Sequence, residues 1–120
     1  MLDRRHRLTS SAGFTEATRR GRRAGSRTLV VHLMAADSAE PQVGVIVSRA
    51  VGGAVVRNRV KRRLRHLARA RLGLLPRSTM VVLRALPPAA DASSTRLAGD
   101  LDSALTRLGA GAAAPGSGAR

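Results

Sequence analysis

The strongest hydrophobic periodicity lies in the middle of the chain, over residues 56–72. Apolar side chains recur there with the spacing of one buried helix face: Val56, Val60, Leu64, Leu67, Ala68 and Leu72. At about 100° per residue, the opposite face is polar and cationic, with Asn58, Arg62, Arg65 and Arg69, flanked by Arg59 and His66. Gly73 and Pro76 end this segment. The pattern predicts an amphipathic helix with its apolar face on a core.

The remaining pattern predicts a small α/β fold. Three short runs rich in β-branched residues predict strands, over residues 28–34, 43–48 and 79–84. Two more segments predict helices, over residues 10–20 and 94–108, the latter capped by Ser93 or Ser94. Because strands and helices interleave, we expect the helices to stack on one face of a mixed sheet, with the other face free to bind. The third strand is expected to join the first two as a meander.

The composition indicates a single domain with a large positive charge. The 120 residues carry 22 Lys and Arg against 7 Asp and Glu, a formal net charge of +15, and Lys61 is the single lysine. No acidic residue lies between Glu40 and Asp91. Residues 110–120 are of low complexity and predict a disordered tail after a single domain over residues 1–109. A small body with this charge favours a polyanion, of which nucleic acid is the commonest.

Several classes of chemistry are disfavoured by the residues present. The chain lacks cysteine, and His6, His32 and His66 do not have metal-ligand spacing. Asp100 and Asp102 are two apart, so we expect them on different faces of a helix and solvated. We therefore expect no catalytic residue and no metal ligand in the protein. No apolar run reaches the roughly 18 residues of a membrane span, and no signal peptide is evident, so a cytoplasmic protein is expected.

The stretch from Val43 onward concentrates the candidate binding chemistry. A predicted strand runs into the Gly52-Gly53 loop and then into a helix whose first turns are cationic, with Arg57, Asn58, Arg59, Lys61, Arg62 and Arg63. A helix N-terminus already favours phosphate, and arginine suits bidentate phosphate contacts. Like charges three or four residues apart repel, so they do not serve helix stability. A merely solvated basic face is the alternative, and the long acid-free interval argues against it.

The same stretch resembles the conserved motif of the bacterial ribonuclease P protein subunit. The positions that fit are Val43, Gly44, Val47, Ser48, Gly52, Ala54, Val55, Arg57, Asn58, Arg59, Lys61, Arg62 and Arg65. A second, N-terminal pattern also fits, through Arg7, Leu8, Phe14 and Gly21. The resemblance covers about residues 4–108.

The resemblance implies an α+β fold, a small α-β sandwich of element order αβββαβα. Its mixed sheet has a left-handed βαβ crossover, an exception to the usual right-handed rule. It also implies that a large RNA subunit performs the cleavage, removing the 5′ leader of precursor tRNA with Mg²⁺ bound mainly by that RNA. The protein would bind the RNA through its basic helix, with Arg57, Asn58, Arg59, Lys61, Arg62, Arg65 and Arg69, and raise the affinity for substrate and metal ions.

The resemblance further implies a cleft for the single-stranded leader between the sheet and the first helix. The corresponding positions are Phe14, Thr18, His32, Ser48, Arg49 and Arg84. Thr18 stands where the family often has a second aromatic residue, and His32 where an aromatic is common. We therefore expect leader contact to depend on charge more than on stacking. Phe14 as a plain core residue and His32 as a solvent-facing strand residue are the alternatives.

Two other functions are compatible with a small basic chain. A structural RNA-binding protein of the ribosomal type shares the size and charge, and the Arg57-Asn58-Arg59 helix after its glycine loop favours ribonuclease P over it. A membrane-active helix would need a wider and bulkier apolar face than residues 56–72 offer. The sequence leaves weak self-association open.

Overall fold

The computed structural model describes residues 21–35 and 40–109 of the chain. The described elements, in chain order, are β1 (Arg22–Gly25), β2 (Leu29–Ala35), β3 (Gln42–Ile46), α2 (Ala54–Ala70), the 3-10 turn η2 (Leu72–Leu74), β4 (Thr79–Ala85), the 3-10 turn η3 (Pro87–Ala90) and α3 (Ser94–Arg107). The predicted helix over residues 10–20 and the predicted tail over residues 110–120 lie outside the described residues.

The strands form one four-stranded mixed sheet of order β1-β2-β4-β3. β2 is antiparallel to both β1 and β4, whereas β3 is parallel to β4. The expected meander is therefore wrong, because β4 inserts between β2 and β3. Its composition is consistent with this place: five of the seven residues of TMVVLRA are buried, as is typical of a strand covered on both sides.

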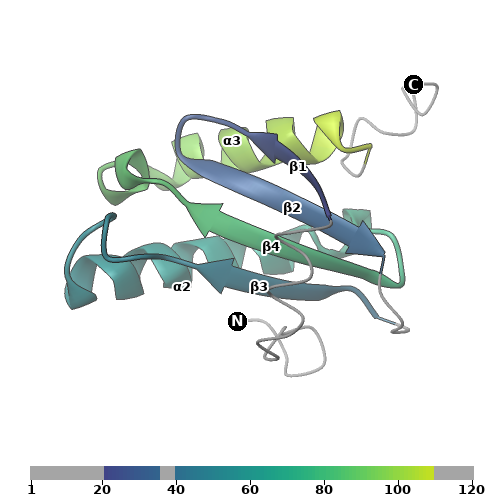
Figure 1. Ribbon diagram of the computed structural model, residues 1–120, viewed down its shortest axis with the longest axis horizontal. Coiled ribbons are helices and arrows are strands. Elements are labelled where there is room, and N and C mark those ends of the chain that lie inside the picture. The colour runs from purple at the N-terminus through teal and green to yellow at the C-terminus, as the bar shows by residue number, and fades with distance from the viewer. Residues whose placement is uncertain (1–20, 36–39, 110–120) are drawn as a thin grey trace.

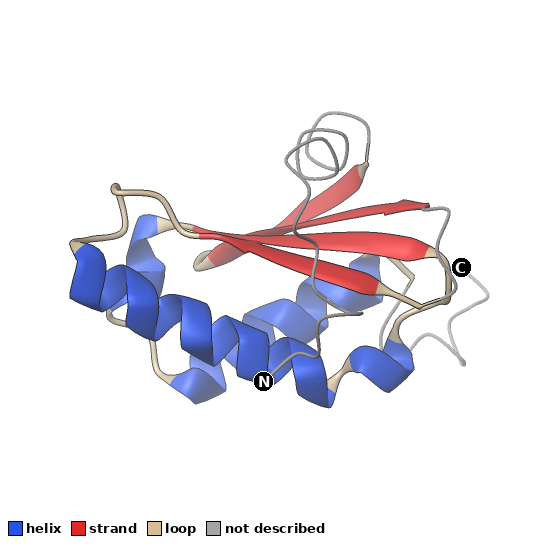
Figure 2. Ribbon diagram, turned by 90° about the horizontal axis from the view of Figure 1, so that it is seen from below, coloured by secondary structure: helices blue, strands red, loops and turns tan. Residues whose placement is uncertain are grey.

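Both described helices lie on one face of the sheet (Figures 1 and 2). α2 runs beside β3 and connects it to β4, while α3 crosses behind β1 and β2 (Figure 1). The two strands joined by α2 are parallel neighbours, and the helix lies on the side of the sheet that makes this crossover left-handed. The left-handed βαβ unit that the family resemblance implied is thus confirmed, against the general right-handed preference.

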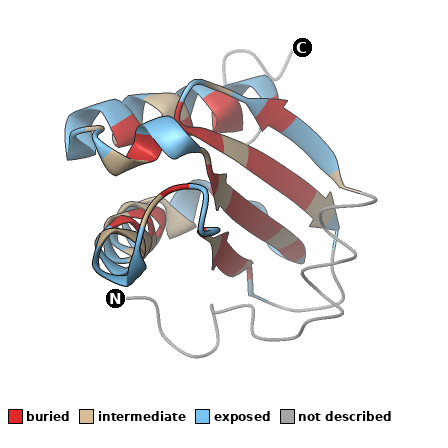
Figure 3. Cartoon of the chain, turned by 60° about the vertical axis from the view of Figure 1, so that its left-hand side comes forward, coloured by how far each residue is buried: buried red, intermediate tan, exposed pale blue. Residues whose placement is uncertain are grey.

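The hydrophobic core fills the space between the sheet and the two helices (Figure 3). β2, β3 and β4 each send alternate side chains into it, as strand geometry requires, and α2 contributes Val60, Leu64 and Ala68. α3 adds Leu97, Leu101, Ala104 and Leu105. The apolar face predicted for the central helix is therefore confirmed, since its remaining members Val56, Leu67 and Leu72 also pack against this core.

Two carboxylates of α3 hold the helix to its neighbours. Asp102 receives two hydrogen bonds from Arg71, from Nε at 2.6 Å and from Nη2 at 3.1 Å. Asp100 accepts a hydrogen bond from the Thr28 hydroxyl at 2.6 Å and lies 3.5 Å from the Arg96 guanidinium. The expectation that both aspartates are solvated is therefore wrong for Asp100, whose side chain is 15% exposed, whereas Asp102 is exposed and also forms an ion pair. Arg71 and Thr28 lie 31 and 72 residues from their aspartates in the sequence, beyond the reach of local pattern, whereas Arg96 is four residues from Asp100.

The cap of α3 follows the sequence prediction. The Ser93 hydroxyl accepts a hydrogen bond from the Arg96 amide at 3.0 Å, as a serine N-cap does. After the helix, Gly109 has a φ of +81°, the left-handed conformation that glycine adopts at little cost. The predicted strands and helices that fall in the described ranges differ from the observed ones by one or two residues at their ends.

Candidate nucleic-acid interface

The loop before α2 fixes where the basic helix begins. Gly52 has a φ of +157°, and a Cβ placed on it would lie 2.9 Å from Cγ1 of Val56, so only glycine fits there without strain. Gly53 is the N-cap residue, with an extended backbone and no side-chain hydrogen bond to the first turn. The first turn of α2 contains no acidic residue. The positive end of the helix dipole is therefore not neutralised by its own sequence.

The cationic side chains of α2 lie on the part of its surface that is not buried in the core. Asn58, Arg59, Arg62 and Arg69 are exposed, and Arg57, Lys61 and Arg65 are half-buried. The half-buried three follow each other at intervals of four residues, so they form one row along the helix. All seven predicted RNA-binding residues thus lie on one helix and outside its buried stripe. Their contact with RNA remains a prediction.

Two arginines of α2, Arg59 and Arg63, also bind the backbone of the segment that precedes α3. Arg59 Nη2 donates a hydrogen bond to the Ala90 carbonyl at 3.1 Å, and Arg63 Nη1 donates one to the Ala92 carbonyl at 3.1 Å. These bonds direct the two guanidinium groups toward η3. Arg62, by contrast, is exposed and makes no such bond. A substitution at Arg62 therefore changes the surface charge without removing a hydrogen bond of the fold.

The sheet face opposite the helices carries the second group of predicted site residues. Strand register places Arg23 beside His32, His32 beside Val82, and Val82 beside Gly44. One step along the strands, Arg84 lies between Val30 and Ile46. We call the residues of the strands that point this way the far face. Its centre differs from the expected open surface, because His32 and Val82 are 2% and 0% exposed.

His32 is the unusual group of the far face. Both of its ring nitrogens are buried, and neither finds a hydrogen-bond partner in the described part of the chain. Burial lowers the pKa of His32 below 6.5, and the positive charges of Arg84 and Arg23 lower the pKa further. The ring is therefore neutral at pH 7, with one nitrogen able to donate and the other able to accept a hydrogen bond. The alternative of a solvent-facing His32 is wrong.

The other predicted leader residues divide into two groups. Ser48 and Arg49 are exposed in the turn after β3, close in sequence to Ile46, which pairs with Arg84. Phe14 and Thr18 lie outside the described residues. Sequence reasoning missed Arg23, because RRAG has no strand-like alternation and β1 was not predicted from it. The basic composition of residues 22–27 was the only available signal.

The described ranges offer little support for metal or membrane chemistry. They hold no group of three or more His, Asp or Glu side chains placed to bind a metal ion. No helix among them is long and apolar enough to cross a membrane.

Known proteins resemble this chain over most of its length. The family model described as Ribonuclease P matches residues 2–109. A ribonuclease P protein component from Nocardioides sp. is 58% identical over 113 residues, covering 92% of this chain and 97% of its own. The protein component from Streptomyces avermitilis is 54% identical over 122 residues, covering 94% of this chain and 99% of its own. The chain belongs to the ribonuclease P protein family.

Solved structures agree at the level of the fold. The ribonuclease P protein of Staphylococcus aureus superposes with a TM-score of 0.79 at 23% identity, covering 88% of this chain and 96% of that one. The protein from Thermotoga maritima gives a TM-score of 0.70 at 21% identity, covering 79% of this chain and 90% of that one. The α+β architecture implied by the sequence resemblance is thereby confirmed.

Proposed function

We propose that this protein is the RNA-binding subunit that assists a catalytic RNA in removing the 5′ leader of precursor tRNA. Membership in the ribonuclease P protein family supports the process, and the cationic surface of α2 supports the mode of action. The observation that carries the proposal is the set of seven polar and basic side chains on α2, of which Asn58, Arg59, Arg62 and Arg69 are exposed.

The basic surface of α2 binds the phosphate backbone of the catalytic RNA. Each guanidinium that neutralises a phosphate releases condensed counterions, so binding weakens as salt rises. The absence of an acidic residue in the first turn of the helix leaves this charge uncompensated. Arginine adds a planar fork of donors that suits phosphate oxygens. Binding at α2 therefore combines strong salt dependence with modest base specificity.

The far face receives the single-stranded leader. Arg23 and Arg84 flank the buried His32 across β1, β2 and β4, which provides positive charge for the leader phosphates. The buried nitrogens of His32 lack partners within the described chain, and an unpartnered buried polar group is costly unless a ligand satisfies it. These observations support leader contact through charge and hydrogen bonding more than through aromatic stacking.

The catalytic RNA supplies the chemistry, with magnesium ions held on its phosphates. Mg²⁺ prefers hard oxygen ligands and is commonly shared with phosphate groups. The described residues hold no group of three or more His, Asp or Glu side chains that could bind a metal ion, so we assign no magnesium ligand among them. Its contribution is to position two polyanions and to reduce their mutual repulsion, which also raises the apparent affinity for substrate and cations.

Charge-neutralising substitutions on α2 test the RNA-binding assignment. We expect Arg62→Gln and Arg69→Gln each to weaken binding to the catalytic RNA and to reduce the slope of log affinity against log salt by about 0.7–0.9. Arg77→Gln is the matched control, because Arg77 is exposed outside the helix. Binding is measured by filter retention across a salt series, and folding by circular dichroism. Equal behaviour of all three variants would show that α2 is not the binding surface.

A further inference from the structure

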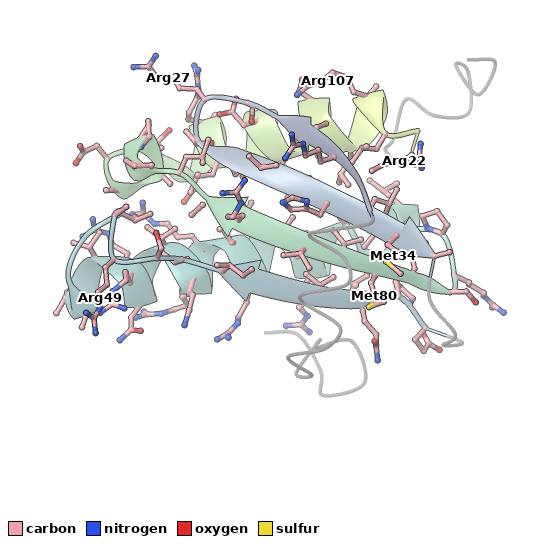
Figure 4. All side chains as sticks on the ribbon, in the orientation of Figure 1. Arg22, Arg27, Met34, Arg49, Met80 and Arg107 are labelled. Carbon is pink, nitrogen blue, oxygen red and sulfur yellow. The ribbon has the colours of Figure 1, made fainter. Side chains whose placement is uncertain are left out.

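A second group of arginines lies at the opposite edge of the sheet from α2. Arg22 and Arg23 are in the edge strand β1, Arg27 is in the turn that follows, and Arg107 ends α3. Figure 4 shows Arg22, Arg27 and Arg107 along the β1 side of the molecule, and Arg49 on the α2 side. We call these four arginines the β1 edge: Arg22, Arg23, Arg27 and Arg107.

Ion pairing within the described part of the chain does not explain the β1 edge. Within residues 21–35 and 40–109, the recorded ion pairs belong to Arg71 and Arg96, so Arg22, Arg23 and Arg27 have no carboxylate partner there. Arg107 donates a hydrogen bond to the Gly25 carbonyl at 2.6 Å, which brings its positive charge beside β1. Gathering like charges is unfavourable for an isolated protein, so this arrangement points to an anionic partner.

The β1 edge is continuous with the far face. Neighbouring residues of a strand point to opposite faces, so Arg23 lies on the far face beside His32 while Arg22 points to the other side of β1. A chain that crosses the far face therefore meets Arg23 first and then, around the edge of the same strand, Arg22. A hollow lined by Arg27, Thr28 and Arg96, together with Pro88, Asp91 and Ala92, extends this surface at the turn.

We propose that the β1 edge binds phosphates of the 5′ part of the precursor leader, beyond the nucleotides that lie on the far face. This inference rests on the proposed function. If the catalytic RNA is held at α2, the cleavage point lies toward β3, and the leader runs from there across β4 and β2 to β1. Single-stranded RNA is the fitting partner because it can bend around a strand edge, whereas a duplex is stiff.

The width of the sheet sets the leader length at which this contact begins. Three gaps between neighbouring strands, each about 4.8 Å wide, give a crossing of about 14 Å. One strand of a duplex advances about 3.4 Å per nucleotide, and a more extended single strand advances further, so at most about four nucleotides span the far face. Leaders longer than about four nucleotides should therefore reach the β1 edge, and shorter leaders should not.

The test uses the reconstituted holoenzyme and the double variant Arg22→Gln/Arg27→Gln, with Arg77→Gln as a control for loss of an exposed charge. Binding is measured for precursor tRNAs with leaders of about two and about ten nucleotides, and for mature tRNA, chosen to lie on either side of the crossing length. We expect the double variant to bind the long-leader precursor roughly three- to tenfold more weakly. Its affinity for the other two RNAs should be unchanged, and the salt slope for the long leader should decrease by about 0.7 per lost contact.

Each other outcome overturns the inference. An equal loss for all three RNAs would place the contact on the tRNA body, and a loss of affinity for the catalytic RNA would place it on that subunit. Unchanged affinities with increased aggregation would show that the arginines only protect the exposed edge of β1. These results are separate from the α2 test. If the double variant assembles into a normal holoenzyme and binds all three RNAs as the wild type does, the inference about the β1 edge fails while the proposed function stands.

Discussion

Replacing Gly52 by alanine tests how the loop before α2 fixes the basic helix. The backbone there has a φ of +157°, and an added Cβ would lie 2.9 Å from Cγ1 and 3.0 Å from Cβ of Val56. Val56 packs against the core, so it cannot move away freely. A non-glycine residue in this conformation costs about 1–3 kcal/mol. We expect Gly52→Ala to reduce the free energy of unfolding by that amount, and the melting temperature by roughly 3–5 °C per kcal/mol.

The adjacent glycine provides the matched control. Gly53 has a φ of −72°, and a Cβ on it would meet no atom within 4 Å. Gly53→Ser should therefore keep or raise stability by a few tenths of a kcal/mol, because a serine N-cap can accept a hydrogen bond from the first turn. Both variants are compared by urea denaturation. A Gly52→Ala protein as stable as the wild type, or a Gly53→Ser protein that loses as much, would refute this reasoning.

Two further predictions concern α3 and the far face. Asp102→Ala removes the acceptor of two hydrogen bonds from the largely buried Arg71 and should lower the free energy of unfolding by about 0.5–1.5 kcal/mol. The control Asp91→Ala should change the free energy of unfolding little. Equal effects of the two variants in urea denaturation would show that the Arg71–Asp102 pair does not stabilise the fold. Because the pKa of His32 is lowered in the fold by burial and then by Arg84 and Arg23, protonation favours the unfolded chain. The free energy of unfolding should therefore be highest above about pH 7 and should decrease as the pH falls below about 6.5. His32→Phe should remove that decrease, which thermal melts between about pH 5 and 8 would measure. If the variant shows the same pH dependence as the wild type, His32 does not titrate as described.

The elements that sequence pattern predicted well are those whose own residues determine their environment. α2 has an apolar stripe from Val56 to Ala68, which Leu72 continues in η2, and the observed burial follows that stripe. β1 was not predicted from its pattern, because RRAG contains a single buried residue, Ala24. The position of β4 between β2 and β3 depends on which strands the α2 crossover brings together. That is a property of long-range packing, which alternation within one strand does not encode.

The candidate site shows the same division. Helical periodicity placed Asn58, Arg62, Arg65 and Arg69 on the outer face of α2; in the structure Arg65 is half-buried and the other three are exposed. The juxtaposition of Arg23 with His32 required the register between β1 and β2, which the sequence did not supply. Likewise, the partner of Asp102 is an arginine at the end of another helix. Local pattern therefore identified the residues of the helix, while the far face and the β1 edge became visible only through sheet topology.

The central claim is that this protein positions RNA while a catalytic RNA performs the cleavage. The direct test is single-turnover cleavage of precursor tRNA by the catalytic RNA alone, by the reconstituted holoenzyme and by the protein alone, across a magnesium series. We predict no cleavage by the protein alone. We also predict a large acceleration by the protein at low magnesium and a small one at high magnesium, where cations already screen the phosphates. Cleavage by protein free of RNA, or an acceleration that is the same at every magnesium concentration, would contradict the claim.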